Sequence, residues 1–320
     1  MEKWLPYFAA LLNAAIVGLS FLFTKMALDT ASPVDTLGYR FLIGWLVLTI
    51  YIKISMKKPL FKHVRFEKKT ITSLLILAML YPTIFFSFQA FGLEYTSSAE
   101  GGIIMAFSPA LTALFAAFFL KERINILQTI FIFLSISGVV YIFYMNGSGI
   151  IISNDKILGI LFLLVSTIAI SGYAVLSRHL SVAFSPIQLT YLMVTMGMVF
   201  FNLYAVIQNA ITGELADFFH LIIEVKFIGS VLFLGIFATM ITAFLSNYIL
   251  SKLTASRMSI FSNLSTVISI AAGAILLNEQ IHFYHIIGSI MIITGVLGTN
   301  LFKETAIKST LRGWNVNEKI

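Results

Sequence analysis

The stretch SPALTALFAAFFLKERINI, from Ser108 to Ile126, decides the fold. A long apolar run ends abruptly at three adjacent charged residues, Lys121, Glu122 and Arg123, and a second apolar run begins directly after them. Such a break fits either a buried charged site or a boundary between membrane and water. The chain as a whole is 59% hydrophobic and only 11% charged, whereas soluble domains have about 25% charged residues. The composition therefore predicts that a lipid bilayer surrounds the protein.

A helix that crosses a membrane needs about 20 mainly apolar residues. Ten segments of the chain meet this requirement, so we expect an all-α integral membrane protein with ten transmembrane helices. The predicted spans are 5–25, 37–55, 70–92, 99–120, 125–145, 156–177, 187–208, 227–250, 257–277 and 283–302.

The distribution of basic residues predicts the orientation of these spans, because Lys and Arg concentrate in cytoplasmic segments. If the N-terminus is cytoplasmic, the segments on that side hold 17 Lys and Arg residues, and the opposite segments hold three, Lys25, Lys156 and Lys226. Both termini are therefore predicted to lie in the cytoplasm, with the protein in the cell (plasma) membrane. The charged triplet after Leu120 becomes the cytoplasmic turn between the fourth and fifth spans.

That turn occurs twice. The sequence LKERI, which starts at Leu120, has a counterpart LNEQI that starts at Leu277, an offset of 157 residues. The same offset pairs Gly138 with Gly295, each in the middle of the next span. A shared order of several weak matches favours an internal repeat.

An earlier pair of stretches, ASPVDTLGY and FSPIQLTYL, extends the repeat and pairs Gly44 with Gly197. We therefore predict two five-span repeats, 1–150 and 155–303, followed by a cytoplasmic tail, 304–320. Because five is odd, the second repeat must enter the membrane from the opposite side. Inverted repeats of this kind are typical of secondary transporters.

The fourth span of each half carries a recognisable pattern. The first copy is YTSSAEGGIIMAFSPALTALFAAFFLKE, and the second is LTASRMSIFSNLSTVISIAAGAILLNE. A Ser/Ala-rich beginning, a Pro in mid-span and a terminal Glu resemble the EamA domain, two copies of which make up the ten-span drug/metabolite transporter superfamily. Thr266 stands where the counterpart of Pro109 would be Pro, so a weaker kink is expected there. The resemblance implies a central cavity lined by spans one, three, four, six, eight and nine.

Polar residues inside a membrane usually face the interior of the bundle, and residues three, four or seven apart share one helix face. Five predicted spans carry such polar stripes, and the third span is mainly aromatic. The candidate substrate-binding residues are Asn13, Ser20, Tyr81, Phe85, Gln89, Met105, Ser108, Thr112, Ser171, Tyr173, Thr239, Thr242, Ser262 and Thr266. Together they would line a moderately polar, uncharged pocket. Alternatively, the small residues only allow the helices to pack closely. Asn13 and Gln89 are the better single candidates, since a buried amide costs more when unpaired.

A second group of residues is a candidate for gating. These residues are Lys25, Arg40, Glu94, Glu100, Pro82 and Pro109. The four charged residues lie near the outer ends of their spans and could form an outer gate, or each could anchor its helix at the interface. Each proline frees a backbone carbonyl, which can serve as a hinge or bind a ligand, although such kinks also occur without a role.

The sequence therefore predicts a secondary transporter rather than an enzyme. Export of small metabolites such as amino acids rests on the resemblance; an uptake permease for a vitamin or nucleoside-like solute and a proton-coupled multidrug exporter stay open. A proton-coupled exporter would need a carboxylate embedded in the membrane, and no carboxylate lies near the centre of a predicted span. We expect no cofactor, no metal site and no catalytic constellation. The expected partners are a small-molecule substrate and the lipid bilayer, with no nucleic acid and no oligomer required.

Overall fold

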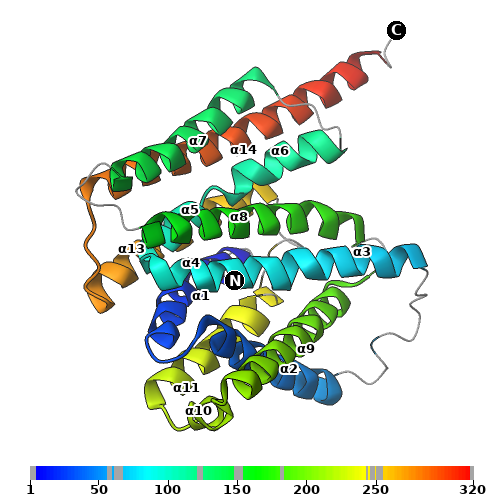
Figure 1. Cartoon of the computed structure of the whole chain (residues 1–320). Coiled ribbons are helices and arrows are strands. Elements are labelled where there is room, and N and C mark those ends of the chain that lie inside the picture. The colour runs from blue at the N-terminus through cyan, green and yellow to red at the C-terminus, as the bar shows by residue number, and fades with distance from the viewer. Residues whose placement is uncertain are drawn as a thin grey trace.

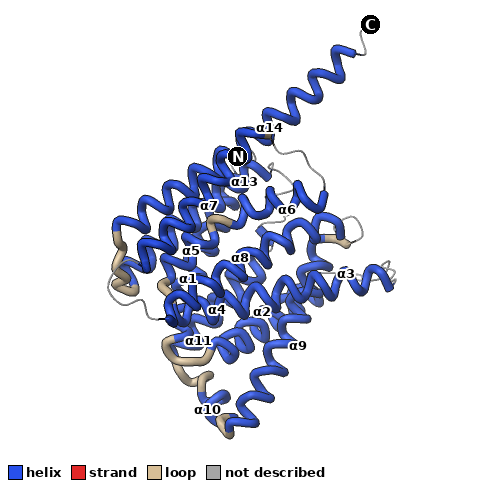
Figure 2. Tube along the Cα trace, turned by 45° about the horizontal axis from the view of Figure 1, so that its top comes forward, coloured by secondary structure: helices blue, strands red, loops and turns tan. Residues whose placement is uncertain are grey.

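The computed structural model describes residues 5–55, 60, 68–120, 125–147, 154–180, 184–242, 244–245, 249 and 255–317. Within these ranges the chain forms helices joined by short turns, without a β-strand. The helices pack side by side into one bundle, and the end of the last helix projects beyond it (Figures 1 and 2). The prediction of an all-α protein is confirmed.

The elements follow the predicted order. Those of the first half are α1 (Leu5–Leu28), α2 (Pro33–Ser55), α3 (Lys68–Ala78), η1 (Met79–Ile84), α4 (Phe85–Tyr95), α5 (Ser98–Met105), α6 (Ser108–Leu120) and α7 (Ile126–Gly147). Those of the second half are α8 (Asn154–Leu180), α9 (Pro186–Thr212), α10 (Leu215–His220), α11 (Val225–Leu232), η2 (Phe233–Ile241), α13 (Ala255–Leu276) and α14 (Phe283–Asn317). The short helix α10 lies in a segment that was predicted to be a linker, and α14 continues into the predicted tail.

Six helical segments of the described residues are long and apolar enough to cross a membrane. They are Leu5–Leu28, Pro33–Ser55, Thr70–Tyr95, Ser98–Phe115, Asn154–Ser177 and Ile187–Thr212. Four shorter apolar segments are Ile126–Ile142, Val225–Ile241, Leu264–Leu276 and Phe283–Thr299. Each of these segments overlaps one predicted span. Large apolar side chains such as Phe133 and Ile211 point outward and stay exposed, as expected for a multi-pass protein with lipid around it.

Three predicted spans are interrupted. In the third span, η1 is a π-helical segment that contains Pro82, and the backbone of Tyr81 is extended there, with φ −144° and ψ 118°. In the fourth, α5 and α6 are separated at Ala106 and Phe107, just before Pro109. Proline lacks the N–H that the helix needs, so the sequence predicts both sites. The third interruption, η2, is π-helical without a proline, and the sequence gives no signal for it.

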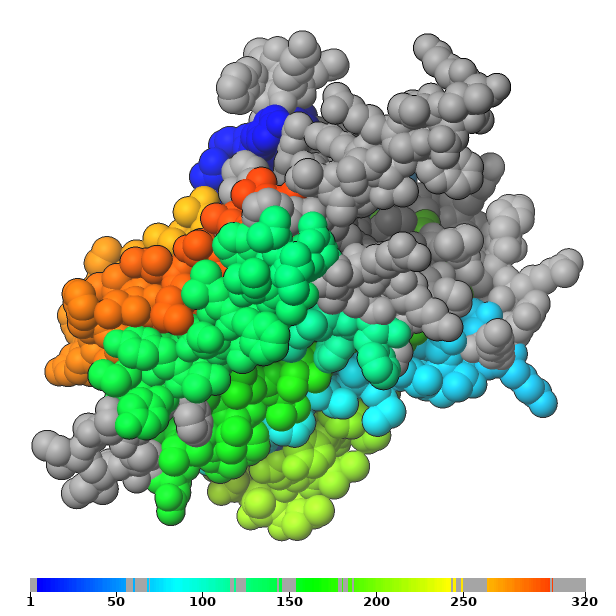
Figure 3. All heavy atoms as spheres, turned by 90° about the horizontal axis from the view of Figure 1, so that it is seen from above, coloured from blue at the N-terminus to red at the C-terminus, as the bar shows by residue number. Residues whose placement is uncertain are grey.

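The long helices pack in pairs. Helix α7 lies along α14, α1 along α13, α4 along α8 and α2 along α9, and α7 (green) adjoins α14 (orange) on the face seen in Figure 3. Small residues allow the closest approach: a Cβ on Gly138 would lie 2.9 Å from the Gly288 carbonyl oxygen. In the same seam, Ser135 Oγ donates to the Ile292 carbonyl at 2.9 Å.

Candidate functional site

An aromatic cluster lies where η1, α4 and α8 meet. The ring centroid of Tyr81 is 4.6 Å from that of Tyr173, 5.4 Å from Phe85 and 5.1 Å from Phe86. The extended backbone of Tyr81 sets the direction of its ring within a chain that is otherwise helical. Met105 packs against the same cluster. Aromatic pairs at these separations stabilise one another by about 0.5–1.5 kcal/mol beyond the area that they bury.

A row of hydroxyls borders the cluster, on α8 and at the break between α5 and α6. Ser108 Oγ lies 3.2 Å from Ser171 Oγ, and Ser171 Oγ lies 2.7 Å from the Thr167 carbonyl. Thr167 Oγ1 is 3.5 Å from the sulfur of Met105. Tyr81, Phe85, Met105, Ser108, Ser171 and Tyr173 were predicted to line one pocket, and the structure brings them together.

Arg40 lies against this cluster from α2. Its side chain is only 3% exposed, and its guanidinium carbon sits 4.2 Å from the ring centroid of Phe86. Its Nε donates to Thr239 Oγ1 at 3.2 Å, and the Thr239 hydroxyl donates to the Leu234 carbonyl within η2. Within the described residues no carboxylate pairs with Arg40. The cation is therefore held by a hydroxyl and an aromatic face.

Gln89 is buried one helical turn after Phe85 and is 7% exposed. Residues four apart share a face, so its amide lies on the side of α4 that carries the aromatic cluster. No hydrogen bond joins this amide to another residue of the described ranges. The amide atoms of Gln89 are not among the fully enclosed, unpartnered side-chain atoms of the described residues, so they remain accessible, and Gln89 is a candidate ligand contact.

The remaining predicted pocket residues lie outside the aromatic cluster. Four hydroxyls bond to backbone carbonyls: Ser20 to Val17, Thr112 to Ser108, Thr242 to Ala238 and Thr266 to Gly102. Asn13 is half-buried on α1. Ser262 lies on α13, but its side chain is outside the described part of the structure. Only the bond from Thr266 joins two helices, and the other three hydroxyls bond to carbonyls within their own helical segment.

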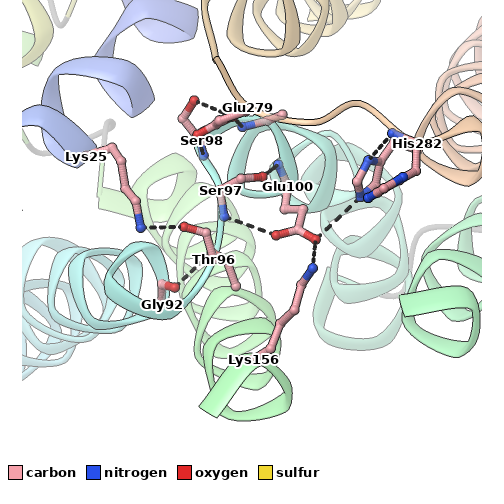
Figure 4. Close-up of polar contacts among 11 residues, drawn as sticks. Lys25, Gly92, Thr96, Ser97, Ser98, Glu100, Lys156, Glu279 and His282 are labelled. Carbon is pink, nitrogen blue, oxygen red and sulfur yellow. Dashed lines mark hydrogen bonds and ion pairs between the residues drawn. The ribbon is translucent and has the colours of Figure 1, made fainter. Parts of the chain in front are cut away.

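The predicted gate residues divide into separate groups. Lys25 Nζ donates to the carbonyls of Leu93 at 2.6 Å and Thr96 at 2.7 Å, and lies 3.3 Å from that of Glu94. Lys25 thus ties α1 to the end of α4 through the backbone, as Figure 4 shows for Thr96. Arg40 instead contacts Thr239 and Phe86, so it shares no partner with Lys25. Lys25, Glu94 and Glu100 therefore lie at one end of the bundle, and Arg40 lies apart from them.

Glu100 is the centre of a second polar group at the Lys25 end of the bundle and is 2% exposed. It closes a capping box with Ser97 at the start of α5. Its Oε1 is 3.1 Å from Lys156 Nζ and 3.4 Å from His285 Nε2. The carboxylate therefore links α5 to α8 and α14, with the imidazole in ion-pair range but outside hydrogen-bond geometry.

Glu279 completes this end of the molecule. Its Oε1 accepts from Ser98 N at 2.7 Å, and its Oε2 accepts from Ser98 Oγ and Ala99 N, both at 3.1 Å (Figure 4). A carboxylate at a helix N-terminus satisfies free N–H groups and the positive end of the helix dipole. We call this contact between Glu279 and the start of α5 the Glu279 latch.

Local sequence explains why the latch forms. Asn278 lies two residues beyond the end of α13 and has a left-handed backbone, φ 53°, a conformation that Asn tolerates better than most residues. This turn carries Glu279 back over the preceding helix, where its N–H bonds to the Gly273 carbonyl. A side chain at Gly273 would collide with the Glu279 carboxylate and with Ser98 Oγ.

Sequence patterns missed several of these residues. Phe86 lies beside predicted pocket residues and could have been included from helical spacing. Lys156, His285 and Glu279 were expected only at span ends or in a repeat motif. Their partners come from helices far apart in the chain, which no spacing in one segment reveals.

Comparison with known proteins identifies the family. The model of the EamA-like transporter family matches this chain twice, at residues 4–144 and 157–301. The chain belongs to the EamA-like transporter family, within the drug/metabolite transporters. The resemblance found in the sequence of the fourth spans is confirmed.

Similar proteins cover almost the whole chain. It is 39% identical over 302 residues to the uncharacterized transporter YcxC of Bacillus subtilis, covering 94% of this chain and 95% of that protein. An uncharacterized transporter of Archaeoglobus fulgidus is 27% identical, over 92% of this chain and 98% of its own length. A solved crystal structure of a protein matches with a TM-score of 0.59 at 17% identity, over 94% of this chain and 99% of that one. That likeness extends to the fold alone.

Proposed function

We propose that this protein is a secondary transporter that exports small metabolites, such as amino acids or related solutes, across the plasma membrane by alternating access. It has ten transmembrane helices in two inverted five-helix repeats, and both termini are cytoplasmic. It acts as a carrier without enzymatic chemistry. Family membership supports transport, and the basic-residue bias supports the orientation.

The observation that carries the alternating-access proposal is the seam between α7 and α14. The hydrogen bond from Ser135 joins it to Ile292, 157 residues later, and 157 is the offset that relates the two halves in sequence. Equivalent residues that touch each other lie on the axis relating two repeats. The neighbouring contacts repeat across this point: a Cβ on Gly138 would meet the Gly288 carbonyl, and one on Gly295 would meet that of Phe131.

The interrupted third helices give a second sign of the same symmetry. One π-helical segment, η1, lies in the third span of the first half, and the other, η2, lies in the third span of the second half. Each of the two glycines that are paired in the sequence packs against the π-helical segment of the other half. Gly44 approaches the backbone of η2 at Gly235, and Gly197 approaches Pro82 in η1. The two family matches, 4–144 and 157–301, also divide the chain near the predicted repeat boundary.

The pocket in this proposal is the aromatic cluster with its bordering hydroxyls. It lies between helices of both halves, because η1 and α4 come from the first repeat and α8 from the second. Secondary transporters bind substrate at such repeat interfaces, often beside broken helices. The remaining predicted pocket residues are proposed as its wider lining.

The gate in this proposal is the polar end that contains Lys25, Glu100 and the Glu279 latch. By the predicted topology this end faces outward, so export requires these contacts to break and re-form in each cycle. Pro82 and Pro109 are proposed as hinges, since each lies at an interruption of a span. Glu122, which is the sequence counterpart of Glu279, lies outside the described residues.

Efflux from liposomes tests the proposal. Purified protein is reconstituted into liposomes loaded with a mixed pool of amino acids and related metabolites, and loss of each solute is followed by mass spectrometry. We expect selective loss without a pH gradient, because the central cluster holds no described carboxylate that could carry a proton. Protein-free liposomes are the control.

Loss of solute only in the presence of a pH gradient would indicate that Glu94 or Glu100 carries a proton. The variants Glu94→Gln and Glu100→Gln would show which of the two is the proton carrier. Loss of no solute, from protein that is folded and inserted, would contradict the metabolite-export proposal and leave the family and fold in place.

A further inference from the structure

We propose that Arg40 is the binding site for a single carboxylate on the substrate, and that the aromatic cluster around Tyr81 holds an aromatic or apolar remainder of the same molecule. This inference rests on the proposed transport function and names the substrate class: small monocarboxylates with an apolar or aromatic side chain.

The unused hydrogen-bonding capacity of Arg40 is the first argument. A guanidinium has five N–H donors and stays protonated. Only Nε donates within the described residues, and its acceptor, Thr239, has its own proton committed to Leu234. Within the described ranges, the four N–H groups on the terminal nitrogens of Arg40 have no acceptor. No carboxylate of these ranges forms an ion pair with the guanidinium.

Burial makes this arrangement expensive. Arg40 is 3% exposed in a chain that lipid surrounds, and ionisable groups inside membranes normally pair with one another or mark a substrate pathway. The face of Phe86 offsets part of the desolvation of the charge, but it cannot accept the in-plane N–H groups. A ligand oxygen is the group that this site lacks.

The charge balance selects a carboxylate. Arginine binds a carboxylate through two parallel hydrogen bonds, which the two terminal nitrogens of Arg40 are free to form. A phosphate monoester carries about −1.5 to −2 charges at neutral pH, so it would need a second cation. Lys25 cannot supply one, because its ammonium is held by the carbonyls at the end of α4.

The groups beside Arg40 define the rest of the ligand. Phe86 lies under the guanidinium and also contacts Tyr81, so a bound carboxylate places its attached chain next to the aromatic cluster. The amide of Gln89, buried on the same side of α4, supplies a further donor or acceptor. Flat or apolar side chains would pack against Tyr81 and Tyr173, whose rings lie 4.6 Å apart.

Isothermal titration calorimetry with matched solutes tests the assignment. 3-Phenylpropionate and 3-phenylpropanamide have nearly the same shape and differ in charge, and L-phenylalanine and phenethylamine add a zwitterion and a cation. With the wild-type protein we expect the acid to bind at least about tenfold more tightly than the amide, as hydrogen bonds to charged groups allow. L-Phenylalanine should bind more tightly than phenethylamine.

Variants then assign the preference to one residue. Arg40→Gln should bind acid and amide equally weakly, and Arg40→Lys should keep part of the preference because it retains the charge without the planar fork. Lys226→Gln is the matched control: it also removes one positive charge, but from an exposed pair with Asp29, and the preference should stay unchanged. Monodisperse elution and an unchanged melting temperature establish that each variant is folded.

Three outcomes would overturn the inference. They are failure of the acid to bind the wild type, equal binding of acid and amide by the wild type, and a preference that persists in Arg40→Gln. The solute pool of the liposome experiment separates this failure from that of the transport proposal. If exported solutes lack a carboxylate, the Arg40 assignment fails and transport stands; if no solute moves, both fail.

Discussion

Lys25 and Arg40 are two cations that the sequence places near the same membrane face, and the structure gives them opposite surroundings. Lys25 donates to the carbonyls of Leu93 and Thr96 at 2.6 and 2.7 Å. Arg40 donates once, to Thr239, and otherwise lies over Phe86. Lys25 is satisfied by the protein, whereas Arg40 keeps most of its donors unused within the described residues.

This difference separates a structural cation from a binding cation. A charge whose donors all find protein acceptors stabilises one arrangement of helices. A buried charge whose donors lack acceptors destabilises the empty protein and is compensated when an anion arrives. Both residues carry one positive charge near the same predicted membrane face, but Lys25 lies half-buried in the last turn of α1 and Arg40 lies buried in the second turn of α2. Burial and the local acceptors distinguish them.

Replacing each cation by methionine should therefore change stability in opposite directions. Lys25→Met leaves carbonyls at the end of α4 without their donor, and we expect the apparent free energy of unfolding to fall by about 2–4 kcal/mol, as for lost hydrogen bonds to a charged group. Thermal unfolding in detergent measures the change. The preference for acid over amide should be unchanged, and a loss of this preference without a loss of stability would place Lys25 in the binding site.

Arg40→Met removes a buried charge and keeps an apolar side chain over Phe86. We expect the apparent free energy of unfolding to rise by about 1–3 kcal/mol, because burial of an unpaired ion no longer opposes folding. The same thermal unfolding assay, without added solute, measures it. A fall in stability comparable to that of Lys25→Met would mean that Arg40 is held by the protein, which contradicts the contrast.

The Glu279 latch should respond to a smaller change at the Lys25 end. Glu279→Gln keeps the size of the side chain but removes the charge that faces the N–H groups of Ser98 and Ala99. We expect the closed arrangement to lose about 1–2 kcal/mol, as charge-assisted hydrogen bonds become neutral ones. Hydrogen exchange of the backbone amides at the start of α5 measures this loss. Exchange as slow as in the wild type would show that the latch does not stabilise the closed arrangement.

Thr239→Val should have the smallest effect. It removes the acceptor of Arg40 Nε and keeps the branched shape. A hydrogen bond to a charged group contributes about 1.5–3 kcal/mol to stability, but this bond is present with and without a bound ligand, so carboxylate affinity should change by only a few-fold in calorimetry. Complete loss of binding would mean that Thr239 contacts the ligand itself.

The sequence predicted most of the frame and part of the site. Hydrophobic runs located the helices, since span length follows membrane thickness, and Pro82 and Pro109 marked two interruptions. Helical spacing grouped Tyr81, Phe85 and Tyr173, and the structure places their rings close together, while their role as a pocket stays a prediction. Contacts between residues far apart in the chain could not be predicted. The pairing of Glu279 with Ser98, and the separation of Arg40 from Lys25, depend on how distant helices pack.

The π-helical segment η2 also escaped prediction. Its residues, Phe233–Ile241, contain no proline and form an ordinary apolar run. The hydroxyl of Thr239 bonds to the carbonyl of Leu234, five residues earlier, as the wider turn of a π-helix allows. Packing of Gly44 against Gly235 brings α2 close to this segment. Close packing of this kind between two helices cannot be predicted from a single sequence.

The most direct test of the account measures whether a carboxylate at Arg40 opens the distant latch. The chain contains no cysteine, so Tyr95→Cys and Gln280→Cys, both exposed positions beside the latch, can each carry a spin label. Electron–electron double resonance then gives the distance between them in lipid nanodiscs. We predict that a bound monocarboxylate shifts the distance distribution in the otherwise unchanged protein and leaves it unchanged when Arg40→Gln is added. An equal shift in both proteins, or no shift with a solute that calorimetry shows to bind, would contradict the account.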